Sequence, residues 1–292
     1  MTPTLPHRPA DGHKGTFGTV LVVGGCSDSN SMMVGGPAFA ALGALRTGAG
    51  RCVLAVPSAV LAETLSVAPS ATGLPLAEDA IESIHGVALD VQAEVVGPGL
   101  GRSTSAVTIV RDRLGADGSP LVLDADGLNI LAAHPGMPRG SRPLIVTPHV
   151  GEHARLASAF DLSDAGDDDV GRSSAAIAMA DRLDAVVVLK GHRTVVADRQ
   201  RAWVCTVGSS VLATGGTGDV LAGTIAGLLA QPSDNDCMES AVLGVWLHAL
   251  AGERWKLHHG DRGLLAGELA AEIPAVLHEC TAGGSPLPDL SS

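Results

Sequence analysis

The sequence predicts an α/β fold built around a central, mostly parallel β-sheet, and three observations support this prediction. Short runs of β-branched and aliphatic residues alternate with longer runs rich in Ala and Leu, which is the pattern of βαβα units in a doubly wound sheet. Several of the short runs are apolar on both faces, as strands buried between two helical layers must be. Hydrophobic residues make up 46% of the 292 residues, which indicates one large domain around one core.

The predicted elements follow one another in that alternating order. Strands are expected at residues 19–23, 52–56, 94–96, 121–123, 144–146 and 186–189. Helices are expected at 37–47, 104–114, 127–133, 151–159 and 173–183 and, in the last third of the chain, at 220–230, 238–257 and 264–278. The runs 194–197 and 202–207 flank a polar segment and predict an antiparallel hairpin at one edge of the sheet. We expect a single domain over 1–280 and a disordered tail, rich in Gly, Pro and Ser, over 281–292.

Composition argues against several classes of protein. The formal net charge is −12 and aromatic residues make up 2% of the chain, whereas nucleic-acid binding depends on basic patches and stacking aromatics. No run reaches the ~18 apolar residues of a membrane span. The five cysteines are scattered without a C-x-x-C pair, which indicates a reduced compartment. We therefore expect a cytoplasmic protein that binds neither nucleic acid nor membrane.

A glycine-rich turn is the most informative segment. Residues 213–219 read Ala-Thr-Gly-Gly-Thr-Gly-Asp and run directly into an apolar helix. Such a turn directs free N–H groups and the positive end of the helix dipole at one point, which suits a phosphoryl group. Asp219 would be repelled by phosphate unless it takes a proton from an attacking hydroxyl. The alternative is that Asp219 only caps the helix.

Four predicted strands end in polar or glycine-rich segments. Residues 94–96 lead into Gly97-Pro98-Gly99-Leu100-Gly101, 121–123 into Asp124-Ala125-Asp126, 144–146 into Thr147-Pro148-His149, and 186–189 into Lys190-Gly191-His192. In an open α/β sheet the ligand site lies outside the carboxyl ends of the strands, so these segments are candidates for it. A P-loop is absent, and the glycines at 97–101 are one residue short of the dinucleotide-binding pattern.

Taken together, these motifs resemble those of the ADP-dependent (S)-NAD(P)H-hydrate dehydratases, a family with a carbohydrate-kinase-like domain in the ribokinase-like superfamily. The segments that carry the resemblance are 13–18, 45–50, 97–101, 123–126, Thr147-Pro148-His149-Val150-Gly151-Glu152, 190–194 and 215–219, in family order and over essentially the whole chain. The resemblance implies a ribokinase-like three-layer α/β/α sandwich with a central mostly parallel sheet and an edge hairpin.

The resemblance also implies a reaction. Hydrated NADH or NADPH, (6S)-NADHX or (6S)-NADPHX, would be dehydrated while ADP gives AMP and phosphate, in a lyase reaction that repairs nicotinamide nucleotides. The preference between NADHX and NADPHX and between ADP and ATP stays open. Mg²⁺ would arrive with the nucleotide, without an assigned protein ligand. We further expect a homo-oligomer, a tetramer being one form, and a separate NAD(P)HX epimerase in the same pathway.

Residue roles follow from the same resemblance. Asp219 would be the catalytic base, and the amides of Gly216, Thr217 and Gly218 would hold the phosphoryl charge. The expected substrate contacts are Gly36, Gly99, His149 and Asp219, and the expected nucleotide contacts are Lys190, Gly191, His192, Arg193, Thr194 and Gly218. The chain departs from the family pattern at Val150, where Pro is usual, at Ser209, where Asn is usual, and at Gly36, where Ala would leave less room for substrate.

Three other functions are compatible with parts of the sequence. The same Asp and turn would serve a small-molecule hydroxyl kinase of the hydroxymethylpyrimidine or thiazole type. His149, Glu152 and His153 fit the zinc peptidase pattern H-x-x-E-H, but Pro148 and Gly151 place His149 in a loop before the helix. A catalytically silent nucleotide-binding regulator is the third alternative, and the intact Gly218-Asp219 pair argues against it.

Overall fold

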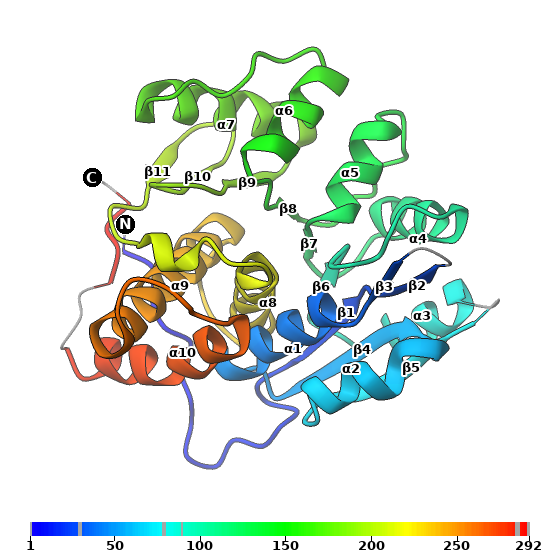
Figure 1. The fold of residues 1–292 in the computed structure, drawn as a ribbon, viewed down its shortest axis with the longest axis horizontal. Coiled ribbons are helices and arrows are strands. Elements are labelled where there is room, and N and C mark those ends of the chain that lie inside the picture. Colours follow the sequence, from blue (N-terminus) through cyan, green and yellow to red (C-terminus); the bar gives the residue numbers. More distant parts are fainter. Residues whose placement is uncertain (1, 29–30, 78–79, 89, 284–286, 291–292) are drawn as a thin grey trace.

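A computed structural model describes residues 2–28, 31–77, 80–88, 90–283 and 287–290. Among these residues, nine strands form one sheet in the order β11-β10-β9-β8-β7-β6-β1-β4-β5 (Figure 1). Their bounds are β1 Thr19–Val23, β4 Arg51–Pro57, β5 Thr72–Leu76, β6 Ala93–Val96, β7 Leu121–Leu123, β8 Leu144–Val146, β9 Val186–Leu189, β10 Val195–Ala197 and β11 Ala202–Val204. All pairings are parallel except those of β10 with β9 and β11. The mostly parallel sheet and the edge hairpin are confirmed.

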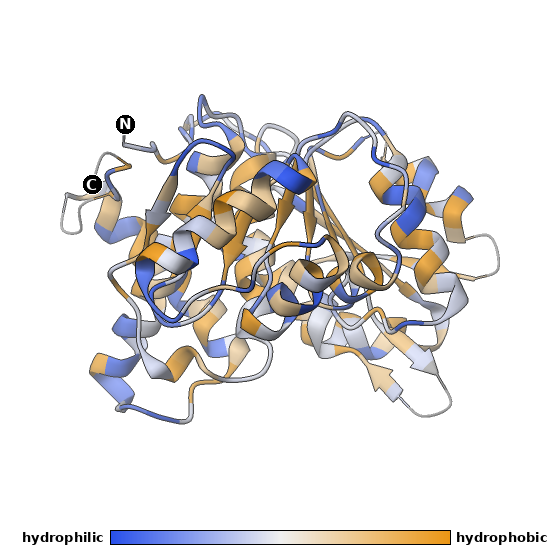
Figure 2. Cartoon of the chain, turned by 90° about the horizontal axis from the view of Figure 1, so that it is seen from above, coloured by the Kyte–Doolittle hydropathy of each residue, from blue (hydrophilic) through white to orange (hydrophobic). Residues whose placement is uncertain are grey.

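Helices cover both faces of the sheet, so the α/β/α sandwich is also confirmed (Figure 2). One face packs against α3 Ala80–Ala88, α4 Thr104–Gly115, α5 Asp126–Ala133, α6 Val150–Ala159 and α7 Asp169–Leu183. The other packs against α1 Gly35–Thr47, α2 Leu61–Val67, α8 Thr217–Ala230 and α9 Cys237–His259, with α10 Ala266–Thr281 outside them. Alternate strand residues serve the two layers: Leu21 faces the first core and Val22 the second.

The pair α1 and α8 lies at the middle of the molecule, next to the site (Figure 1). Glycines allow these two helices to approach closely. A Cβ on Gly223 of α8 would lie 1.9 Å from the carbonyl oxygen of Ala40, and a Cβ on Gly43 of α1 would lie 2.3 Å from that of Val220. Only glycine fits at both positions, and the two contacts hold the first two turns of α8 against residues 40–43 of α1.

Several elements were not predicted. They are the short hairpin of β2 Cys26–Asp28 and β3 Ser31–Met33, the strand β5, the helices α2 and α3, and the 3₁₀ turns Ser58–Val60 and Ser210–Leu212. The strand β5 has the sequence TGLPL, and its Gly and Pro are depleted in strands. It forms because Pro75 lies at the edge of the sheet, where its missing N–H leaves no interior hydrogen bond unmade.

Helix boundaries also differ. α8 begins at Thr217 rather than at 220, because the glycine turn tightens directly into the helix. In the segment 281–292, Leu287 and Leu290 pack against the core. Residues 284–286 and 291–292 lie outside the described residues, and the disorder expected over 281–292 stays a prediction. Within the described residues, no helix combines the length and the apolar character needed to cross a membrane.

Candidate active site

The site is organised by the first turn of α8. Gly216 precedes the helix in the left-handed conformation, with φ of 92°, which glycine adopts without strain. The N–H groups of Gly218 and Asp219 have no acceptor among the described residues, whereas the N–H of Thr217 donates to Thr214 O over 3.4 Å. The Thr217 hydroxyl donates to the carbonyl oxygen of Leu212 over 2.7 Å. Thr217 thus holds the turn together. Its N–H, expected to bind the phosphoryl group, is already used, and the free donors of this turn include the N–H of Asp219 instead.

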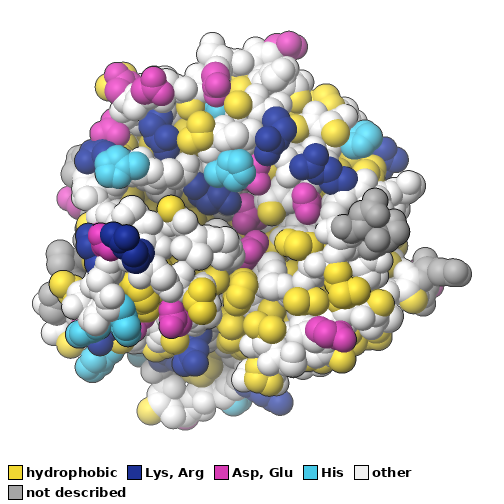
Figure 3. Space-filling view, viewed as in Figure 1, with side chains coloured by type: hydrophobic (Ala, Val, Ile, Leu, Met, Phe, Trp, Pro, Cys, Tyr) yellow, Lys and Arg dark blue, Asp and Glu magenta, His cyan; other side chains and the backbone are white. Residues whose placement is uncertain are grey.

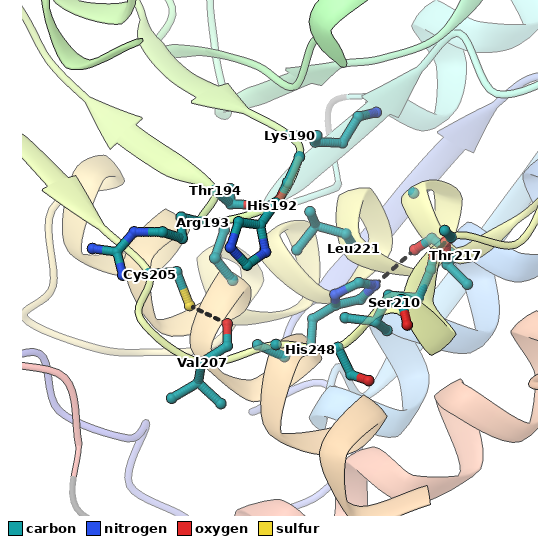
Figure 4. Close-up of a pocket in the computed structure, with 18 of the residues that line it drawn as sticks. Lys190, His192, Arg193, Thr194, Cys205, Val207, Ser210, Thr217, Leu221 and His248 are labelled. Carbon is teal, nitrogen blue, oxygen red and sulfur yellow. Dashed lines mark hydrogen bonds between the residues drawn. The ribbon is translucent and has the colours of Figure 1, made fainter. Parts of the chain in front are cut away.

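A cavity of about 630 Å³ opens beside this turn (Figure 4). The five residues expected to contact nucleotide, 190–194, line it, as do His149, Thr217 and Gly218. The remaining lining comes from residues 205–210, from 212–214, from Leu221 and from Val245, His248 and Ala249 of α9. Residues from four separate parts of the chain therefore line one cavity: His149, 190–194, the stretch 205–221, and α9.

Within the 190–194 loop, the side chain of Arg193 is already engaged. Its guanidinium donates to Asp169 of α7 over 2.8 Å, and in Figure 4 it points away from the other labelled residues. The backbone of the loop is turned by Gly191, with φ of 151°, and by Arg193, with φ of 58°. The loop thus offers the cavity its backbone and the side chains of Lys190, His192 and Thr194.

The amine of Lys190 forms a buried cluster with two carboxylates. It lies 2.7 Å from Asp124 Oδ1 and 3.9 Å from Glu152 Oε2. The Asp124 side chain is 1% exposed and that of Lys190 18%. Burial lowers the pKa of Lys190, but the negative charges of Asp124 and Glu152 outweigh it and raise this pKa overall. Lys190 is therefore a fixed cation.

The same cluster sets the protonation of Asp219. Burial and the nearby charge of Asp124 raise the pKa of Asp219 to about 7, with Lys190 acting in the opposite direction. A Cβ on Gly218 would lie 3.3 Å from Lys190 Nζ, so the amine lies over the start of α8. Figure 3 shows acidic side chains gathered in a hollow at the middle of this face, with basic side chains beside them.

His149 is the N-cap of α6, outside the helix as the sequence predicts. Its Nδ1 accepts the N–H groups of Gly151 over 3.0 Å and Glu152 over 3.3 Å, and Glu152 accepts the N–H of His149 over 2.8 Å. Burial and the positive charge of Lys190 lower the pKa of His149, so the ring is neutral and its Nε2 carries the hydrogen. The side chain is 55% exposed, and its Nε2 lies 3.4 Å from Glu152 Oε1.

The zinc interpretation finds no ligand set here. His153 is fully buried and lies 3.5 Å from Asp164, whereas His149 is exposed at the start of the helix. In the part of the chain that the structure describes, no three His, Cys, Asp or Glu side chains are grouped as a metal site would need. His149 and Glu152 of the H-x-x-E-H pattern thus lie together at the start of α6, whereas His153 is buried beside Asp164.

Gly36 and Gly99 lie next to each other, where the start of α1 meets the 97–101 loop. A Cβ on Gly36 would lie 3.0 Å from the carbonyl carbon of Pro98 and 3.1 Å from the nitrogen of Gly99. The missing Cβ lets α1 approach the 97–101 loop, and the expectation that Gly36 leaves more room for substrate stays a prediction. Phe39 of α1 reaches the glycine turn, since a Cβ on Gly216 would lie 2.8 Å from its ring.

The structure adds Asp124, Asp126 and Glu152 to the residues proposed from sequence. Asp126 Oδ2 accepts the N–H of Gly101 over 2.9 Å, which ties the 97–101 loop to α5. Between the two aspartates, Ala125 has φ 51° and ψ −118°, values that a type II′ turn usually gives to glycine, and such strain is typical of functional sites. The sequence could have indicated these three residues, because each carboxylate follows the end of a predicted strand that was already a candidate for the ligand site.

Comparison with known proteins shows the family to which the chain is similar. The family model described as NAD(P)H-hydrate dehydratase matches residues 20–275. An ADP-dependent (S)-NAD(P)H-hydrate dehydratase of Bacillus subtilis is 36% identical over 280 residues, 94% of each chain. The crystal structure of an ADP/ATP-dependent NAD(P)H-hydrate dehydratase from B. subtilis, co-crystallised with ATP and Mg²⁺, superposes with a TM-score of 0.79 at 34% identity over 94% of each chain.

Some relatives are about twice as long as the segment that they share with this chain. The bifunctional NAD(P)H-hydrate repair enzyme of Moorella thermoacetica is 37% identical over 285 residues, which are 94% of this chain and 52% of that protein. The chain thus spans about half the length of this and other bifunctional relatives. The chain belongs to the NAD(P)H-hydrate dehydratase family.

Proposed function

We propose that this member of the NAD(P)H-hydrate dehydratase family dehydrates (6S)-NADHX or (6S)-NADPHX with ADP as co-substrate, releasing AMP and phosphate. One observation carries the proposal: free amides, a buried carboxyl of raised pKa and a fixed lysine meet at the first turn of α8. Thr217 and Gly218 of this turn line the same cavity as 190–194, and Gly216 before them lies against Phe39 of α1, three residues after Gly36. A nucleotide in the cavity and a hydrated dinucleotide at the Gly36–Gly99 contact would meet at this turn.

Phosphoryl transfer would be the first step. Asp219 takes the proton from the ring hydroxyl of the substrate, whose oxygen forms a bond to the terminal phosphorus of ADP while the bond from that phosphorus to AMP breaks. A pKa of about 7 suits a general base at neutral pH. The amides of Gly218 and Asp219 and the helix dipole stabilise the charge on the phosphoryl oxygens.

Elimination would follow. The carbon–oxygen bond of the phosphorylated ring breaks, phosphate leaves with the bonding electrons, and the neighbouring carbon loses a proton, which restores the double bond of NADH or NADPH. Phosphate is a far better leaving group than hydroxide, which explains why a dehydratase consumes a nucleotide. The same amides that bind the transferring phosphoryl group would hold the departing phosphate.

Lys190 and the carboxylates near it would place the nucleotide phosphates. The amine lies beside Gly218 and keeps its charge, so it offsets part of the acidic potential that would repel a phosphate. The donor set fits Mg²⁺ only as an ion carried by the phosphates, because the described residues include no group of three or more His, Cys, Asp or Glu side chains that could hold a metal ion, and Mg²⁺ often keeps waters and phosphate oxygens as ligands. When bound, Mg²⁺ would neutralise charge on the phosphates; Asp124 and Glu152 are the carboxylates nearest to Lys190.

Further proposals follow from the family resemblance and from composition. ATP would replace ADP, as the description of the B. subtilis relative as ADP/ATP-dependent suggests for that protein. We also keep the homo-oligomer and the cytoplasmic location as predictions, the latter resting on the scattered, free cysteines.

The test is recovery of the reduced-nicotinamide absorbance band when the purified protein meets hydrated NADPH, with ADP, with ATP and without nucleotide. We expect recovery only with nucleotide and one AMP formed for each NADPH restored when ADP is used. Hydroxymethylpyrimidine and thiazole alcohols serve as comparison substrates. Faster consumption of ATP with such an alcohol than of ADP with the hydrate would favour the kinase alternative and reject this proposal.

A further inference from the structure

His248 of α9 lies in the wall of the cavity and is hydrogen-bonded to the phosphate-binding turn. The side chain is 8% exposed, and its Nε2 lies 2.9 Å from the backbone carbonyl oxygen of Thr217 (Figure 4). A carbonyl oxygen only accepts, so Nε2 must carry the hydrogen. The tautomer of this imidazole is therefore determined by the backbone of α8.

The other ring nitrogen is then an acceptor. The ring's hydrogen bond within the described part of the chain is made by Nε2, not by Nδ1, and in Figure 4 Nδ1 lies on the side of the ring away from Thr217. Burial and the positive charge of Lys190 lower the pKa of His248 to about 4, although the hydrogen bond to Thr217 acts to raise it. The ring stays neutral at physiological pH, so Nδ1 keeps its lone pair.

The surroundings of this acceptor suit the base of a nucleotide. Leu212, Leu221, Val245 and Ala249 line the same cavity as His248 with apolar groups, and flat aromatic ligands bind between such side chains. The thiol of Cys205, which also lines the cavity, already donates a hydrogen bond to the carbonyl oxygen of Val207 over 3.2 Å. An N–H donor on the ligand is what would satisfy Nδ1.

We propose that His248 is the residue that selects the base of the co-substrate: Nδ1 accepts the exocyclic amino group of a 6-aminopurine and discriminates against a 6-oxopurine. The proposal rests on the proposed function, because it assigns the base of the ADP to this cavity. A 6-oxo oxygen in the same place would face Nδ1 with a lone pair of its own. Two acceptors cannot form a hydrogen bond, so Nδ1 would be left unpaired in the complex. His248 is a specificity-determining residue in this proposal and takes no part in the transfer of the phosphoryl group.

The arrangement also joins the base to the phosphate site. The N–H of the same ring supports the carbonyl oxygen of Thr217, the first residue of α8, and the next two amides are the free donors of the turn. A base seated on Nδ1 would fix the ring and so stabilise the turn that receives the phosphates.

The experiment is calorimetric titration of the intact protein with ADP and with IDP, which differ only in the 6-substituent and the protonation at N1. We expect ADP to bind about 10-fold more tightly than IDP, the effect of one unpaired buried group. His248→Phe, which keeps a ring but neither nitrogen, should bring the two affinities to within about 2-fold of each other. His258→Phe, an exposed position of the same helix outside the cavity, should keep the wild-type ratio.

The outcomes separate this inference from the proposed function. Equal binding of ADP and IDP by the wild type would overturn the inference, and so would an equal loss of both nucleotides in His248→Phe with the ratio unchanged, which is the signature of a purely structural role. The wild-type ratio alone decides the first point if that variant fails to fold. No binding of ADP to the wild type would instead refute the proposed function.

Discussion

Lys190 is held by Asp124 through a 2.7 Å ion pair between groups that are nearly removed from solvent. The lysine belongs to the nucleotide loop after β9 and the aspartate to the turn after β7, 66 residues earlier. The pair thus joins the loop after β9 to the turn after β7. Removal of either partner leaves the buried charge of the other without an opposite charge beside it.

Removal of the lysine is the first prediction. Lys190→Ala should weaken nucleotide binding and lower the free energy of unfolding by about 3 kcal/mol, the usual result of breaking a buried pair. Denaturant titration and calorimetry with ADP measure the two effects. The double variant Lys190→Met with Asp124→Asn should recover most of the lost stability, and a double variant as unstable as Lys190→Ala would show that the pair is not the cause.

Removal of the proposed base is the second prediction. Asp219→Asn should lower turnover by roughly 10²-fold or more, since the amide cannot accept a proton. Binding of ADP should persist or tighten, because a negative charge beside the phosphates is gone. Asp261→Asn, at an exposed site, is the matched control and should keep full turnover. Near-normal turnover of Asp219→Asn would make Asp219 a helix-capping residue only.

The third prediction concerns pH. Asp219 must be ionised to act, so kcat/KM should rise with pH through a midpoint near 7, which is its raised pKa. Stability moves in the opposite direction: the folded state holds this proton more tightly than the unfolded state, so the stabilising effect is full below pH ~4 and is lost as pH rises through about 7.

Asp219→Asn should therefore be more stable than the wild type at pH 8, by an amount on the order of 3 kcal/mol, and lose this advantage towards pH 4. Urea unfolding of both proteins at several pH values measures the difference. An advantage that does not change with pH would show that burial does not raise this pKa.

Two histidines of one motif give the fourth prediction. His149→Ala should raise the KM for the hydrated dinucleotide, because an exposed N–H donor at the site is lost. His153→Ala should leave turnover of the folded protein within a few-fold while it lowers stability by about 2 kcal/mol or more, since a fully buried ring is replaced by a cavity. Stoichiometric bound zinc that both substitutions abolish would instead support the metal interpretation.

A pair of helical glycines gives the fifth prediction. Gly267→Ala in α10 has open space around the new Cβ and should stabilise the protein by roughly 0.5–1 kcal/mol. Gly36→Ala should show no such gain and should raise the KM for the hydrate a few-fold, because its Cβ presses on the backbone of the 97–101 loop. Equal stabilisation by both substitutions, with KM unchanged, would place the substrate elsewhere.

Much of the site was predictable because its residues occur at strand ends and in a glycine turn. A buried parallel strand needs an uninterrupted apolar run, so β6 to β9 are visible in the sequence, and polar residues directly after them lie at the ligand-binding edge. The segments that escaped prediction are those in which edge position or tertiary contact outweighs local preference, such as β5 with its Gly and Pro and the short pair β2 and β3.

The sequence by itself thus determined the fold class, the glycine turn with Asp219, and the loops that follow the strands. Only the tertiary structure decided that Lys190 is paired with Asp124 and Glu152. It also decided that the N–H of Thr217 donates to Thr214 O instead of being free for a ligand, and that His248 turns one nitrogen toward the cavity. The physical reason is that apolar periodicity reports which face of each element is buried, whereas ion pairs between residues far apart in the chain depend on the order in which the strands pair.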